Sequence, residues 1–97
     1  MVPLVMRANA GPEVRFEEND SELRAVEIVH PGRSPMITSL HRALFAIGVV
    51  VSSYQVVNRG PRMVERVVLE RQQGGSVRGP LSAAARAAIL PIALAAR

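Results

Sequence analysis

From residue 13 onward the apolar positions follow two different periods, and the change of period predicts where strands give way to a helix. In residues 13–18, Val14 and Phe16 alternate with charged side chains, which is the period of two of a half-buried strand. A polar turn occupies residues 19–21, and a second apolar segment covers residues 23–29. Together the two apolar segments predict a β-hairpin.

A helix is predicted after this hairpin. Ser34 has a side chain suited to an N-cap, and Pro35 follows at the first helical position, where a backbone N–H is not needed. Gly48 suits the end of the helix because glycine adopts a positive φ without strain. Between them, apolar side chains fall on one helical stripe at Ile37, Leu40, Leu44 and Ile47.

The second half of the chain repeats the order of two strands and a helix. Residues 49–58 are rich in β-branched side chains, and after a turn residues 63–70 carry apolar side chains at even spacing. A glycine-rich loop then leads to Pro80, which begins a helix over at least residues 81–90. Pro91 removes a backbone donor, so we expect it to kink or end this helix.

The fold class predicted from these elements is α+β, with the order ββαββα. Each strand and helix has an apolar face to bury, which favours a four-stranded antiparallel sheet with two helices on one face. We expect a single domain over residues 13–97, preceded by a flexible leader over residues 1–12.

The core is expected to be small. The chain has 97 residues and is 48% hydrophobic, but its only aromatic residues are Phe16, Phe45 and Tyr54. A core of this size is often completed by a partner subunit. The strand at residues 49–57 is apolar on both faces, so we expect a homodimer joined through a sheet edge or through helices. The lack of cysteine excludes disulfides and thiolate metal sites, and no metal site is expected.

Charge and hydropathy argue against two classes of partner. All twelve basic residues are arginines and the net charge is +4, but the arginines are spread along the chain and mixed with glutamates. The strand at residues 65–70 also has no aromatic side chain that could stack on a base, so no nucleic-acid partner is expected. No apolar segment is long enough to cross a bilayer. We therefore expect a cytoplasmic protein with no membrane partner.

Several short motifs occur in an order that resembles a known family. The first strand reads Pro12-Glu-Val-Arg-Phe-Glu-Glu-Asn19, and the turn before the first helix reads Gly32-Arg-Ser-Pro-Met-Ile37. Further matches are Gly48, Gly60 and the pair Gly79-Pro80. The whole resembles the ACT domain, and most of all the version at the C-terminal end of bacterial protein-PII uridylyltransferases. This resemblance implies a ferredoxin-like two-layer sandwich and a non-catalytic regulatory module for amino acid sensing or dimerisation.

The resemblance also implies where a ligand would bind. An amino acid or another small anion is expected at Gly32, Arg33, Ser34, Pro35, Met36 and Ile37, with no cofactor and no catalytic residue. The family has Asp where this chain has Gly32 and Gly where it has Pro35, and only Arg33 is kept. Because proline offers no backbone N–H to a carboxylate, we expect weak binding or none. The module would then act through contacts with a parent enzyme or a partner protein.

Other interpretations of these residues stay open. The chain could be a protein–protein interaction domain, or an enzyme on a ferredoxin-like scaffold such as an acylphosphatase. The acylphosphatase family places its phosphate loop after the first strand, whereas the glycine-rich loop of this chain comes much later, at residues 74–80. His30 and His41 have no carboxylate at a useful spacing in the sequence, so acid–base catalysis is not expected.

Overall fold

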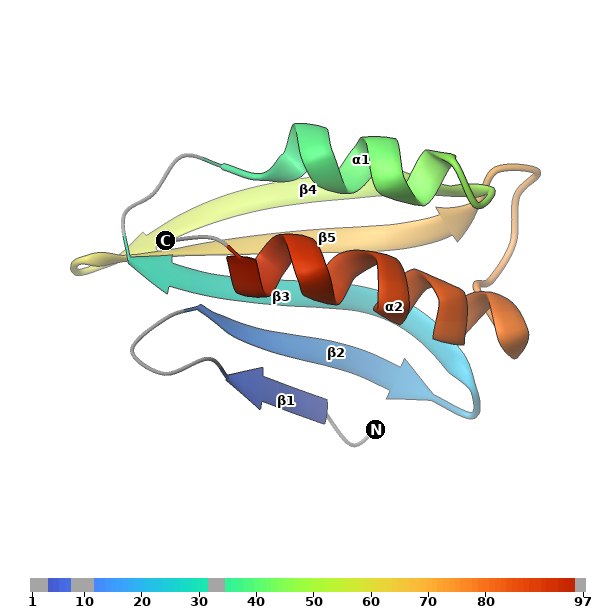
Figure 1. The fold of residues 1–97 in the computed structure, drawn as a ribbon, viewed down its shortest axis with the longest axis horizontal. Helices are drawn as coiled ribbons and strands as arrows, with labels where there is room; N and C mark the ends of the chain where they lie inside the picture. Colours follow the sequence, from blue (N-terminus) through green and yellow to red (C-terminus); the bar gives the residue numbers. More distant parts are fainter. Residues whose placement is uncertain (1–3, 8–11, 32–34, 96–97) are drawn as a thin grey trace.

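A computed structural model describes residues 4–7, 12–31 and 35–95 of the chain. These residues form one antiparallel sheet of five strands and two α-helices (Figure 1). The elements in chain order are β1 Leu4–Arg7, β2 Glu13–Asn19, β3 Glu22–Pro31, α1 Ile37–Phe45, β4 Val49–Arg59, β5 Arg62–Arg71 and α2 Pro80–Ala95.

The sheet has the strand order β1-β2-β3-β5-β4, and every neighbouring pair is antiparallel. Both helices lie side by side on one face of it (Figure 1). The predicted α+β class is therefore confirmed, but the strand order is not that of a ferredoxin-like sandwich. In a βαββαβ unit a strand after the second helix lies beside the first strand. Here the N-terminal strand β2 pairs with β3 and takes that position.

The sheet has one strand more than the sequence pattern predicts. Residues 4–7, which lie in the segment expected to be a flexible leader, form β1 and pair with β2. In the register of this pair, Leu4 lies opposite Phe16 and Arg7 lies opposite Glu13. The segment is only four residues long and has no clear alternation, which is why the period of two did not reveal it.

The core fills the space between the helices and the inner face of the sheet. Phe16 from β2 is fully buried, and Leu40 and Leu44 from α1 reach the same cluster, as the helical stripe predicts. Ala85, Ile89 and Ala93 on α2 are fully buried. The other sheet residues of this cluster are Val14, Leu23, Val26, Ile28, Val49, Val67 and Leu69.

Helix α2 begins at Pro80, as predicted, but it does not end at Pro91. It continues to Ala95, and Pro91 lies exposed within it. Ala93 is buried beyond the proline, so packing on the sheet holds the last turn in place despite the missing backbone bond. In the part of the chain that the structure describes, no helix is long and apolar enough to span a bilayer.

Candidate functional site

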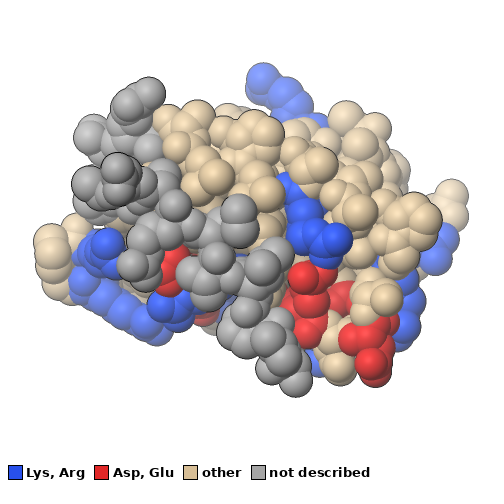
Figure 2. Space-filling view, turned by 60° about the horizontal axis from the view of Figure 1, so that its bottom comes forward, with Lys and Arg blue, Asp and Glu red and all other residues tan. Residues whose placement is uncertain are grey.

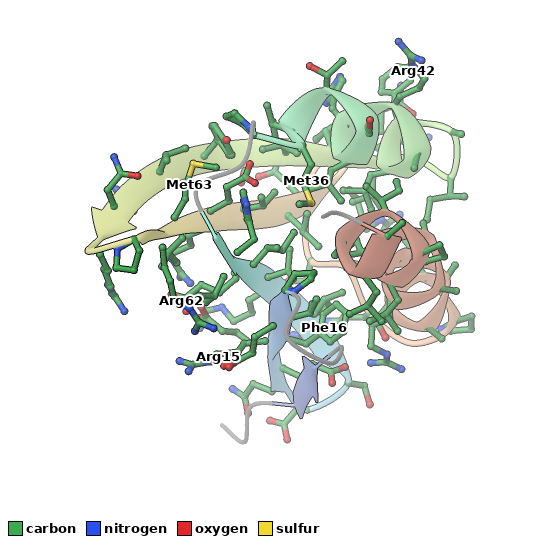
Figure 3. All side chains as sticks on the ribbon, turned by 60° about the vertical axis from the view of Figure 1, so that its left-hand side comes forward. Arg15, Phe16, Met36, Arg42, Arg62 and Met63 are labelled. Carbon is green, nitrogen blue, oxygen red and sulfur yellow. The ribbon has the colours of Figure 1, made fainter. Side chains whose placement is uncertain are left out.

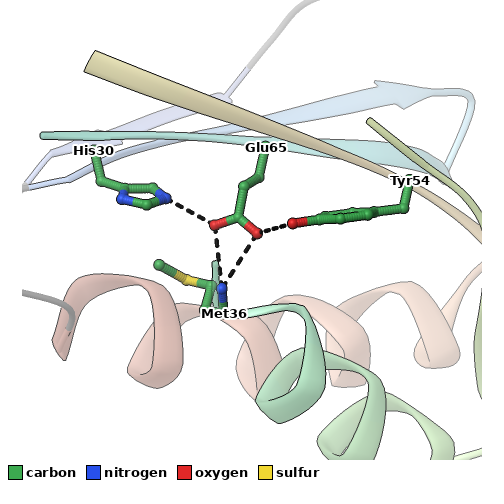
Figure 4. A network of polar contacts seen from close by, with 4 residues as sticks. All are labelled: His30, Met36, Tyr54 and Glu65. Carbon is green, nitrogen blue, oxygen red and sulfur yellow. Dashed lines mark hydrogen bonds and ion pairs between the residues drawn. The ribbon is translucent and has the colours of Figure 1, made fainter. Parts of the chain in front are cut away.

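A buried polar cluster lies on the inner face of the sheet, under the start of α1. It consists of His30 on β3, Tyr54 on β4, Glu65 on β5 and the backbone amide of Met36 (Figure 4). Glu65 is completely buried, and His30 is only 1% exposed. Groups of this polarity are rarely placed in an apolar core unless they are paired, so this cluster is the most unusual chemical feature among the described residues.

Strand register places these side chains together. Ile28 on β3 lies directly opposite Glu65, and His30 follows two positions further along the same face. On the other side of β5, Tyr54 lies opposite Val67 and so occupies the diagonal position next to Glu65. Three neighbouring strands therefore each supply one polar side chain to the inner face.

Glu65 is the centre of the cluster. Its Oε2 atom lies 2.7 Å from the Nε2 atom of His30, and its Oε1 atom accepts a hydrogen bond of 2.6 Å from the Tyr54 hydroxyl. The backbone N–H of Met36 donates to both carboxylate oxygens, at 3.2 and 3.3 Å. Donors on three sides hold the carboxylate in place, and each oxygen has at least two of these partners.

The carboxylate also completes the N-terminus of α1. The N-cap residue is Met36, and no side-chain cap bond comes from that residue itself. The first amides of a helix have no partner inside the helix and carry partial positive charge. Glu65 supplies both a hydrogen-bond acceptor and a negative charge at this point, from 29 residues away in the chain. The cap predicted at Ser34 lies outside the described residues.

The local electrostatics favour neutral Tyr54. Burial raises the pKa of the Tyr54 hydroxyl above its usual value, and the hydrogen bond to Glu65 and the negative charge of that carboxylate raise it further. Tyr54 therefore remains a donor to Glu65 over the physiological pH range. The Nδ1 atom of His30 is buried and has no hydrogen-bond partner among the described residues.

The residues predicted to bind a ligand are placed only in part. Pro35 is exposed, and Met36 and Ile37 are half-buried and pack against the core. Gly32, Arg33 and Ser34 lie outside the described residues. The Met36 amide, which the sequence analysis offered to a ligand carboxylate, instead donates to Glu65.

The prediction made for His30 was wrong. No carboxylate lies at a useful spacing in the sequence, yet Glu65 lies within hydrogen-bond distance, 35 residues further along the chain. The sequence did contain a signal for this contact. Glu65 falls in the same every-second-residue series on β5 as the apolar residues Met63, Val67 and Leu69, so its side chain points to the same inner face. A charged residue at a core position of an otherwise apolar strand requires buried partners. His41, by contrast, lies on the exposed part of α1 beside Phe45, with ring centroids 5.8 Å apart.

The arrangement is suited to holding structure in place. His30 and Glu65 are both sealed from solvent, so their atoms are not presented to a substrate. No group of three potential metal-binding side chains (His, Cys, Asp or Glu) occurs within residues 4–7, 12–31 and 35–95. The start of the glycine-rich loop is hydrogen-bonded to the end of β5. The Gly74 amide donates to the carbonyl of Arg71, and the Arg71 amide donates to that of Gly75.

Comparisons with protein-family models, with curated proteins and with solved structures gave no match. The geometry of the described residues therefore carries the functional argument.

Proposed function

We propose that the chain is a non-catalytic regulatory domain of the ACT kind that acts through protein contacts rather than through a tightly bound amino acid. The observation that carries this proposal is the Glu65 carboxylate at the N-terminus of α1. A ligand carboxylate at the predicted site would bond to these same helix amides. In this chain the Glu65 side chain takes that role. This agrees with the loss of a backbone N–H at Pro35, where the family has glycine.

The enzyme alternative has less support. A catalytic acid or base must come within hydrogen-bond reach of its substrate. The one described His–Glu pair, His30 with Glu65, is buried between the sheet and α1. Its contacts connect secondary-structure elements, which favours a structural role.

Self-association is part of the proposal, and helix α2 is the surface that favours it. A helix that is apolar all round is normally covered on all sides. Arg86 is the only charged residue of α2, and it forms an ion pair with Glu18 on β2. The outward face of the helix is a smooth apolar stripe of exposed residues, Ala83, Ala87, Pro91 and Ala95. We propose that this stripe packs on its copy in a homodimer.

Light scattering at tens of micromolar tests the dimer. Ala87→Glu adds a charge to the middle of the stripe and should convert a dimer to a monomer, since an unpaired charge in an interface is strongly unfavourable. Ser39→Glu adds the same charge to an exposed position of α1 and should leave the dimer intact. A wild-type protein that is monomeric under these conditions would exclude the homodimer.

Calorimetry and chemical rescue test the role of Glu65. We expect no amino acid to bind the wild-type chain with sub-micromolar affinity. Glu65→Ala should lose stability and regain part of it in acetate or propionate, because a free carboxylate fits the vacated space at the Met36 amide. Chloride at the same ionic strength is the control. Tight binding of an amino acid to the wild type, lost in Arg33→Ala, would contradict the proposal.

A further inference from the structure

The free edge of β4 is a second candidate binding surface, in addition to the apolar stripe on α2. β4 is the last strand of the sheet, and from Ser53 to Arg59 it pairs with β5 in an uninterrupted register. Among the described residues, no strand lies beside its outer backbone groups. Val56 and Val57 are 40% and 47% exposed, and they point to opposite faces. A long, regular edge with exposed valines can accept an added strand.

The charge at one end of this edge is uncompensated. Arg59 lies directly opposite Arg62 across the β4–β5 turn, an arrangement of like charges that is unfavourable on its own. Both side chains are exposed, and neither has an ion-pair partner among the described residues. Figure 3 shows Arg62 on the side of the sheet away from the helices. β4 itself contains no acidic residue.

The acidic groups of the described residues are mostly engaged elsewhere. Figure 2 shows basic side chains at both ends of the molecule and on the face between them, whereas the acidic ones lie mainly in the right half of this view. Glu17 pairs with Arg66, Glu18 with Arg86 and Glu22 with Arg78. The Arg59 and Arg62 pair has no acidic neighbour on β4, so it can attract an oppositely charged partner.

We propose that the β4 edge binds an extended acidic segment of a partner protein as an added antiparallel strand. An antiparallel segment would begin beside Arg59, so its N-terminal residues should be acidic. Two adjacent apolar residues should follow opposite Val57 and Val56. Backbone hydrogen bonds along β4 provide the affinity, and the charges select the partner.

This occupant fits the edge better than the other candidates do. A second copy of β4 would bring no acidic side chain and would leave Arg59 uncompensated in both copies. A single-stranded nucleic acid needs aromatic side chains on which bases stack. The only aromatic residue of β4 is Tyr54, whose hydroxyl already donates to Glu65 on the inner face.

The test uses the full chain, labelled with ¹⁵N, and a seven-residue peptide with two N-terminal acidic residues followed by two apolar ones. We expect amide shifts confined to β4 and to the neighbouring part of β5. The double variant Arg59→Glu/Arg62→Glu should weaken binding roughly tenfold. Arg24→Glu/Arg42→Glu changes the net charge equally at two exposed arginines away from the β4–β5 turn, neither of which has an ion-pair partner within the described part of the chain, and it should have little effect. Methylation of alternate peptide amides should abolish binding.

Several results would overturn the inference. The inference is wrong if the acidic peptide binds no better than a lysine-substituted one. It is also wrong if both double variants weaken binding equally. Shifts of β4 amides that depend only on protein concentration would show that a second copy occupies the edge. Tighter binding of a single-stranded oligonucleotide at the same amides, lost in the Arg59/Arg62 variant, would identify nucleic acid as the occupant instead.

Discussion

The Glu65 carboxylate accepts hydrogen bonds from the backbone amide of Met36, so a strand residue caps a helix whose N-cap residue lies 29 residues earlier. The same carboxylate holds His30 and Tyr54. One side chain therefore connects β3, β4, β5 and α1, and the position of the turn before α1 depends on it. Substitution of Glu65 should disturb more of the fold than its single position suggests.

Glu65→Ala should destabilise the domain by about 3–5 kcal/mol, because it leaves three donors without an acceptor in the core. Glu65→Gln keeps the shape but replaces the charged acceptor, so its cost should be smaller, about 1–3 kcal/mol. Urea unfolding followed by circular dichroism measures both. Glu70→Gln, at an exposed position of β5, is the matched control and should stay within about 0.5 kcal/mol of the wild type. Equal stability of Glu65→Ala and wild type would refute the capping role.

The raised pKa of Tyr54 predicts how stability changes at alkaline pH. The folded pKa lies above that of the unfolded chain, which is about 10. Above pH 10 the unfolded state therefore binds fewer protons than the folded state, and stability falls as the pH rises. The contribution is fully present below pH 10. Unfolding midpoints between pH 8 and 11.5 should show this fall, and Tyr54→Phe should make it shallower. A fall of the same steepness in both proteins would assign it to other groups.

Pro91→Ala should stabilise the protein. Pro91 is exposed inside α2, where its ring crowds the carbonyl four residues earlier and leaves that carbonyl without its helical donor. Alanine restores the bond, with an expected gain of about 1–3 kcal/mol. Thermal unfolding is the measurement, and Pro61→Ala, at an exposed position in the β4–β5 turn, is the control. A loss of stability would show that the last turn of α2 packs only in its present form.

Gly48→Ala should cost about 1–2 kcal/mol, because Gly48 has a φ of +85° after the end of α1. No atom lies within 4 Å of an added Cβ, so the cost comes from the backbone alone. Gly48→Asn should lose less, since asparagine tolerates this conformation better than alanine. Chemical unfolding of both variants checks the order. A larger loss for asparagine would contradict the backbone explanation.

Short-range patterns in the sequence predicted the positions of individual helices and strands. The apolar stripe marked the position of α1, and Pro80 marked the start of α2. The predicted ends of α1 were wrong, because the helix runs from Ile37 to Phe45 and so includes neither Pro35 nor the residue before Gly48. The helix cap was mispredicted because the sequence analysis sought it at neighbouring residues, whereas Glu65 reaches it through strand pairing. The contact between His30 and Glu65 depends on the register of β3 against β5, which no short-range pattern specifies.

The short strand β1 also determines how far a sheet of this kind can grow. It covers the outer side of β2, and with only four residues it offers little template for another chain. The sheet is thus closed at one end and open at the other. A strand that adds to β4 finds no second long edge on this molecule, because the short β1 lies at the other end of the sheet. This asymmetry permits a defined complex at β4 and opposes the open-ended stacking that leads to fibrils.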